Sequence, residues 1–148
     1  MVTFTVDSDY GYVILAATST FILNTLHGIN TGTYRKAAQI AYPAAYAPSS
    51  RSDAAAHRFN CAQRAHANFT ENHTIAVTAL LVSGLQFPKT AALLGGAWSV
   101  SRWLYMKGYS RGDEGGKGRY RGISFWFFQL GLVGLCGWMG AVGFGGRM

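Results

Sequence analysis

"YGYVILAATSTFILNTLHGINTGTY", residues 10–34, contains no Asp, Glu, Lys or Arg and decides the fold class. A segment of this length can cross a hydrocarbon core of about 30 Å, which takes roughly 20 residues of α-helix. Residues 122–146 form a second uncharged window of the same length. Two shorter windows, 72–88 and 90–101, reach a spanning length when they are extended through the polar residues beside them. The pattern predicts four transmembrane helices, at about residues 10–34, 54–86, 88–110 and 119–144 of a single domain over residues 1–148.

The composition favours a membrane protein. Of 148 residues, 49% are apolar and 13% are charged, against roughly 25% charged in ordinary globular domains. Buried core helices of a soluble protein are the alternative explanation of each uncharged window. Four such windows in a chain this short leave too little polar surface to keep a globule in water. The sequence therefore predicts an all-α integral membrane protein.

The basic residues are distributed unevenly between the two predicted sides of the membrane. The first and third loops, with the helix ends that flank them, carry Arg35, Lys36, Arg51, Arg58, Arg64, Arg102, Lys107, Arg111, Lys117, Arg119 and Arg121. Only Lys89 and Arg147 fall on the other side. Because cytosolic loops carry an excess of Lys and Arg, the basic side is predicted to be cytosolic, with both termini across the membrane. A net charge of +7 in this arrangement indicates topology, anionic lipid or an anionic small ligand rather than nucleic acid.

Arg64, Asn68 and Glu71 form a polar stripe near the start of the second predicted helix. Their spacings of four and three residues place them on one helix face. One explanation is a local ion pair between Arg64 and Glu71, bridged by Asn68. The other is a binding site for a zwitterionic, peptide-like ligand, in which the Arg binds a carboxylate, the amide fixes the orientation and the Glu accepts an ammonium group. The spacing alone leaves both explanations open.

Arg102, Tyr105 and Tyr109 share a face of the third predicted helix, near its cytosolic end. Tyrosines in this position commonly anchor a helix in the aromatic belt of the membrane interface. Their hydroxyl groups could equally donate hydrogen bonds to a ligand at the cytosolic edge. These residues are therefore candidates for the second wall of a site that begins with the polar stripe.

Lys117, Arg119 and Arg121 open the fourth predicted helix. A basic cluster of this kind sets topology or contacts lipid headgroups, but a fixed guanidinium can also stabilise an anion such as a thiolate. A thiol with an ordinary pKa of about 8.5 needs a depression of roughly two units, or about 2.7 kcal/mol, to ionise near pH 6.5. The His and Cys residues show no tight pattern of metal ligands, so no metal site is predicted.

Several motifs together carry a family resemblance. "FNCAQRAHANFTEN" at residues 59–72 resembles the second-helix motif of the MAPEG family of membrane proteins. The resemblance extends to "DYGYVILAATSTF" at 9–21, "YRKAAQIAYPAAY" at 34–46 and "SRWLYMKGYSRG" at 101–112, and so covers nearly the whole chain in order. It implies a four-helix membrane bundle that assembles as a homotrimer, with glutathione bound between neighbouring subunits near the cytosolic side.

The resemblance also implies roles for individual residues. The implied glutathione contacts are Arg64, Asn68, Glu71, Tyr105, Arg35 and His66. Tyr109 would lie close to the glutathione sulfur, and Arg119, three residues before Gly122, would stabilise the thiolate. The loop before Arg119 is about two residues longer and richer in glycine than the family pattern, which leaves Arg121 and Lys117 as alternatives for that role.

The implied activity is glutathione transfer to hydrophobic electrophiles, with glutathione peroxidase activity toward lipid hydroperoxides. Such an enzyme would serve detoxification and lipid metabolism at the endoplasmic reticulum membrane, with its active site facing the cytosol. Glutathione would be the cosubstrate and no metal would be needed. Two alternatives within the same resemblance are conjugation of the leukotriene C4 synthase type and a non-catalytic protein that presents lipid to partner enzymes.

Overall fold

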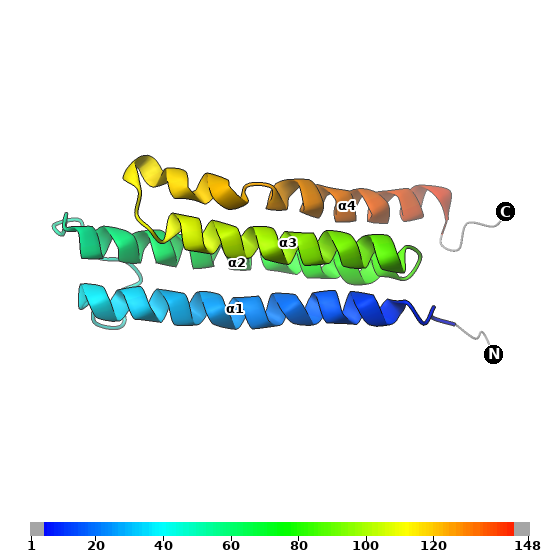
Figure 1. The fold of residues 1–148 in the computed structure, drawn as a ribbon, viewed down its shortest axis with the longest axis horizontal. Helices are drawn as coiled ribbons and strands as arrows, with labels where there is room; N and C mark the ends of the chain where they lie inside the picture. Colours follow the sequence, from blue (N-terminus) through cyan, green and yellow to red (C-terminus); the bar gives the residue numbers. More distant parts are fainter. Residues whose placement is uncertain (1–4, 144–148) are drawn as a thin grey trace.

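The computed structural model describes residues 5–143, and the regular structure in this part of the chain is entirely helical. Figure 1 shows four long helices lying side by side, with a short 3-10 helix before the last one. The start of α1 and the end of α4 lie at the same end of the molecule. In chain order the elements are α1 (Tyr10–Ala38), α2 (Ala54–Gly84), α3 (Pro88–Tyr109), η1 (Glu114–Gly122) and α4 (Phe125–Val142).

The first helix ends later than the sequence predicts. It continues through Arg35 and Lys36 to Ala38, four residues beyond the predicted end, and stops where Gln39 adopts a left-handed conformation with φ of 55°. The charged residues that close the apolar window do not end the helix, because cations are favourable in the last turn of a helix, near its negative dipole end. The apolar window predicts the membrane segment rather than the length of the helix.

The boundaries of α2 and α3 follow from local signals. Asp53 caps α2, and its side chain accepts a hydrogen bond from the Ala56 backbone N–H at 3.1 Å. Pro88 begins α3, in the first turn, where its missing N–H leaves no helix bond unmade. Both boundaries lie where the sequence predicts them, whereas α2 ends at Gly84, two residues early.

The fourth helix was predicted to begin at Arg119, but α4 begins at Phe125. Residues 114–122 instead form η1, which is interrupted at Gly115 and Gly116 because both have positive φ. The glycines also let η1 approach α3 closely: a Cβ on Gly122 would meet the backbone of Ser101 and Tyr105. The glycines of this segment have a low propensity for α-helix, and Gly122 packs closely against α3. These two effects explain why residues 114–122 form a 3-10 helix instead of the first turns of α4.

The core contains cross-helix hydrogen bonds as well as apolar contacts. Trp98 of α3 donates from Nε1 to Oε1 of Gln129 at 3.1 Å, and Gln129 of α4 donates from Nε2 to Oδ1 of Asn72 at 3.2 Å. Asn72 lies on α2, so the three side chains join three helices in the interior. Thr20 and His73 join α1 to α2 through a bond of 2.8 Å. These hydrogen bonds pair the buried polar groups of Asn72, Trp98 and Gln129, as an apolar surrounding requires.

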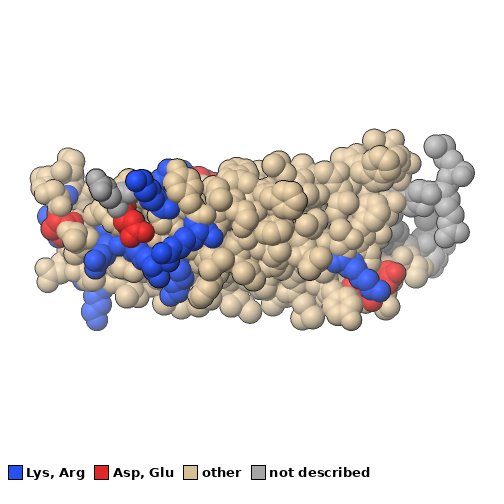
Figure 2. All heavy atoms as spheres, turned by 45° about the horizontal axis from the view of Figure 1, so that its top comes forward, with Lys and Arg blue, Asp and Glu red and all other residues tan. Residues whose placement is uncertain are grey.

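Two helices within the described residues, α1 and α4, are long and apolar enough to cross a membrane by length and composition. The expectation of four spans therefore has compositional support at two of the four long helices. The other two carry more charge: α2 begins with a polar half, and α3 includes Lys89, Arg102 and Lys107. Figure 2 shows charged side chains gathered at the two ends of one face, with a broad uncharged band between them.

Candidate functional site

The candidate site lies at the basic end of the molecule, where α2, α3 and η1 meet. Figure 2 shows most of the Lys and Arg side chains of that face at this end. At the opposite end, Lys89 pairs with Asp9 at 3.0 Å. The asymmetry agrees with the distribution of basic residues along the sequence, although Arg147 lies outside the described residues.

Arg64 and Glu71 form a bidentate ion pair on the surface of α2. The Arg64 Nη1 lies 2.7 Å from Glu71 Oε1, and Nη2 lies 3.4 Å from Oε2. Both side chains are about half exposed, at 47% and 51%. The structure thus forms the local ion pair that the sequence offered as one explanation. An exposed pair of this kind contributes only about 0–1 kcal/mol, so it can exchange partners readily.

Asn68 does not bridge that pair. Its Oδ1 instead accepts a hydrogen bond of 2.8 Å from Nη1 of Arg102, on α3. The bond fixes the orientation of the Asn68 amide and directs its oxygen toward α3. Within residues 5–143 the Nδ2 of Asn68 has no hydrogen-bond acceptor, which leaves a donor free for a ligand.

Arg102 is fully buried among aromatic rings. Its guanidinium carbon lies 4.2 Å from the ring centre of Phe125 and 4.7 Å from that of Tyr105, with Phe69 at 5.6 Å and Trp98 at 5.8 Å. Cation–π attraction of this kind is strongest where water is excluded. Its Nε and Nη2 have no hydrogen-bond partner within residues 5–143. A buried guanidinium with unpaired N–H groups is rare and suggests a ligand site.

Tyr105 and Tyr109 continue the path from Arg102 toward η1. The two tyrosine rings meet edge to face with centres 5.6 Å apart. The Arg119 guanidinium carbon lies 6.0 Å from the ring centre of Tyr109. Asn68, Arg102, Tyr105, Tyr109 and Arg119 therefore form an unbroken series of contacts from α2 through α3 to η1.

Arg119 is held by its own loop. Its Nη1 donates to the carbonyl of Gly115 at 3.1 Å, and its Nη2 donates to the Tyr120 hydroxyl at 3.0 Å. The nearby Tyr120 hydroxyl, with smaller effects from Tyr109 and Tyr105, raises the pKa of Arg119 above its usual value. The guanidinium therefore keeps its positive charge at every physiological pH.

The two alternatives to Arg119 lie on the same segment. Arg121 is exposed, and its Cδ lies beside Gly108 of α3. Lys117 is also exposed. Among the three, Arg119 is the one that the structure places against the ring of Tyr109.

Two of the predicted contacts lie elsewhere. Arg35 donates from Nη1 to the carbonyl of Ala44 at 2.7 Å and stacks on Tyr42 and Phe59, so it holds the loop between α1 and α2. His66 lies on the α1 side of α2, with its ring centre 5.8 Å from that of His27. Within residues 5–143 neither residue touches the series directly, and His66 is linked to Arg102 through the rings of His27 and Phe69.

Sequence reasoning undervalued two buried polar residues. Arg102 was noticed only with the tyrosines beside it, and Gln129 was passed over inside an apolar helix. The available signal was the same for both, because a lone polar residue within an apolar span is usually paired or functional. Their partners lie on other helices, so the sequence does not show what they bind.

The long apolar helices and the charged, aromatic site at one end define this chain as a membrane-bound, all-α protein. A model of the MAPEG family matches residues 13–141, which runs from α1 into the end of α4. The chain belongs to the MAPEG family, as its motifs indicated. This family is membrane-bound, uses glutathione, and includes glutathione transferases, peroxidases and proteins of related function.

Proposed function

We propose that this chain is a membrane-bound glutathione transferase with glutathione peroxidase activity toward lipid hydroperoxides. The observation that carries the proposal is the series of contacts from Asn68 through Arg102 and the two tyrosines to Arg119. It joins free hydrogen-bond donors, suited to an acidic peptide, to a permanent cation suited to a thiolate. Both features are needed to bind and activate glutathione.

Binding begins with the exposed Arg64–Glu71 pair. A zwitterionic peptide offers a carboxylate to Arg64 and an ammonium group to Glu71, so one ion pair is replaced by two. Asn68 donates from its free Nδ2, and the unpaired N–H groups of Arg102 attract a further carboxylate. The residues present thus fit glutathione, whose carboxylates and ammonium group match these donors and acceptors.

Arg119 stabilises the thiolate form of the bound peptide. A fixed positive charge beside the sulfur lowers the pKa of the thiol, because it favours the anionic form. Tyr109 lies between Arg119 and Tyr105 and orients the sulfur. The protein supplies position and charge, and the nucleophile belongs to the cosubstrate, which attacks a hydrophobic electrophile arriving from the lipid.

The proposed assembly is a homotrimer of four-span subunits in the endoplasmic reticulum membrane. The basic end faces the cytosol, in accordance with the excess of positive charge there. Glutathione lies between neighbouring subunits, where Arg35 and His66 of the chain are further proposed contacts. Within the family we place the chain nearest to microsomal glutathione S-transferase 3, from its second-helix motif.

Two other activities remain as second candidates. Conjugation of the leukotriene C4 synthase type uses the same thiolate and differs in the electrophile. A non-catalytic protein that presents lipid to partner enzymes has no need for the thiolate cation. The position of Arg119 against Tyr109 favours catalysis over presentation.

The ultraviolet absorbance of the thiolate tests the proposal directly. Adding glutathione to the purified protein at neutral pH should produce the signal, and Arg119→Ala should abolish it while Arg121→Ala retains it. The reverse pattern would transfer the role to Arg121. No signal in the unaltered protein would refute the transferase mechanism. S-Methylglutathione, which has no ionisable thiol, should bind the unaltered protein and Arg119→Ala equally, which separates activation from binding.

A further inference from the structure

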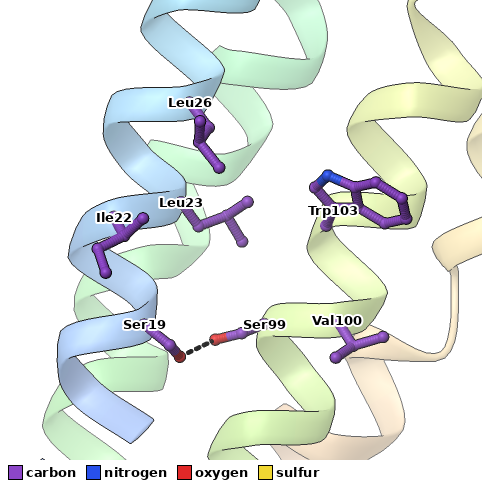
Figure 3. A pocket seen from close by; sticks show the side chains of 7 residues that line it. All are labelled: Ser19, Ile22, Leu23, Leu26, Ser99, Val100 and Trp103. Atoms are coloured by element: carbon purple, nitrogen blue, oxygen red, sulfur yellow. Dashed lines mark hydrogen bonds between the residues drawn. The ribbon is translucent and has the colours of Figure 1, made fainter. Parts of the chain in front are cut away.

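A groove runs along the outer side of the contact between α1 and α3. Its first part is a hollow of about 220 Å³ that includes Ile22, Leu26, Val100 and Trp103 in its lining. Figure 3 shows Leu23 and Leu26 directed from α1 toward the space beside Trp103. A second hollow of about 340 Å³ also includes Leu26 and Trp103, so the two parts are continuous.

The groove matches one leaflet of a bilayer in length. Along α1 it extends from Ser19 to Tyr34, which corresponds to roughly 22 Å at 1.5 Å per residue. Half of a bilayer with its headgroup region measures about 20–22 Å. A hydrogen bond of 2.8 Å between Ser19 and Ser99, also visible in Figure 3, ties the helices together at the inner end. A bond of 2.8 Å from Asn30 to Ser110 ties them near the basic end.

The lining changes from apolar to polar along the groove. Apart from the two serines at its inner end, the first hollow is lined by apolar side chains and Trp103. The second hollow adds Asn30, Thr33, Tyr34 and Lys107. Lys107 is exposed, and no acidic side chain pairs with it within residues 5–143. The groove therefore offers an apolar channel that ends at one uncompensated positive charge.

We propose that the groove between α1 and α3 binds one acyl chain of an anionic phospholipid, with the lipid phosphate at Lys107. The apolar channel takes the chain, whose length is that of one leaflet. A lysine at the membrane surface extends its ammonium group toward the headgroups and attracts anionic lipid. The other acyl chain stays in the surrounding bilayer, because the groove is open along its length. The site contains none of the residues assigned to glutathione and does not depend on the proposed activity.

Trp103 lines the groove, so quenching of its fluorescence shows which lipid occupies the groove. The chain has four tryptophans, of which Trp126 and Trp138 are exposed and are replaced by Phe. Trp98 stays because it is buried, and its emission is subtracted with a Trp103→Phe variant of the same background. The protein is placed in phosphatidylcholine nanodiscs that contain equal fractions of brominated phosphatidylglycerol or brominated phosphatidylcholine. Bromine quenches tryptophan only at contact distance.

Brominated phosphatidylglycerol should occupy the groove with about five-fold preference, the ratio expected from one lysine near an anionic surface. Lys107→Gln should reduce the preference to none. Lys36→Gln should leave it intact, since Lys36 is an exposed basic residue at the same end that does not line the groove. Equal quenching by the two lipids, persistence of the preference in Lys107→Gln, or its equal loss in Lys36→Gln would each overturn the proposal.

Discussion

Replacing Asn68 separates the two roles that its amide has in the structure and in the proposed function. Its Oδ1 accepts the hydrogen bond from Arg102, and its Nδ2 is free for glutathione. Asn68→Asp keeps an acceptor for Arg102 but removes the donor. Asn68→Ala removes both. The first variant should therefore lose ligand affinity while keeping the contact between α2 and α3, and the second should lose both.

The expected losses of stability and of ligand affinity follow from the strength of hydrogen bonds to charged groups. A hydrogen bond to a charged group contributes about 1.5–3 kcal/mol. The Asn68–Arg102 bond is of this kind, because the guanidinium is charged and buried, and within residues 5–143 it is the one side-chain hydrogen bond of Arg102. In binding, loss of a donor to a charged ligand group corresponds to roughly a 10- to 150-fold weaker Kd. The negative charge of the introduced aspartate also repels the ligand carboxylates, which weakens binding further.

Two measurements on the detergent-solubilised protein test the two roles of the Asn68 amide separately. The midpoint of thermal denaturation should fall in Asn68→Ala and hold in Asn68→Asp, while titration with S-methylglutathione should show weakened binding in both. Thr70→Ala is the matched control, since Thr70 is exposed on the same helix and its hydroxyl donates to the Ala67 carbonyl one turn earlier in α2. Wild-type affinity in Asn68→Asp would show that Nδ2 does not contact the ligand. An unchanged midpoint in Asn68→Ala would refute the stabilising role of the bond to Arg102.

Two further predictions concern the fold. Gly122→Ala should destabilise the fold by about 1–3 kcal/mol through overpacking, because its Cβ meets the backbone of Ser101, and should lower the thermal midpoint. Gly134→Ala on α4 has open space and should hold or raise the midpoint, because Ala favours a helix more than Gly does. Equal midpoints in the two variants would contradict the close approach. The pKa of Asp53 is held well below its usual value by Arg51 and by a backbone N–H, so its stabilisation is complete above about pH 4 and is lost as pH falls through the folded pKa. The midpoint difference between wild type and Asp53→Asn should therefore shrink on acidification, and a difference that stays constant from pH 7 to pH 2 would disprove the assignment.

The sequence predicted helix positions best where a local signal marks the boundary. Asp53 and Pro88 begin α2 and α3 as expected, because capping and proline effects act over one turn. The start of α4 was wrong, because it depends on how closely η1 packs against α3, and sequence periodicity contains no such distance. The predicted end of α1 was too early, because the prediction ended the helix where the apolar window ends, before Arg35. A cation is favourable in the last turn of a helix, so α1 continues through Arg35 to Ala38.

In the candidate site too, the sequence predicted contacts within one helix but not contacts between helices. The spacing of Arg64 and Glu71 correctly placed both on one face of α2, where they form a pair. The partner of Asn68 is Arg102, on another helix, and a contact between helices cannot be read from spacing along one of them. His66 shares α2 with the stripe but its ring lies beside His27 of α1, and its proposed contact with glutathione rests on the resemblance and stays a prediction.

The glycines of η1 divide it into an outward tip and a part that is fixed against α3. Gly115, with positive φ, has open space around it, while Gly118 and Gly122 lie directly against α3. The Gly115 carbonyl accepts a hydrogen bond from Nη1 of Arg119, so residues inserted after Gly115 would remove a contact that holds this cation. Changes in length are therefore best tolerated before Gly115, where they leave both the bond to Arg119 and the close packing of Gly118 and Gly122 against α3 in place.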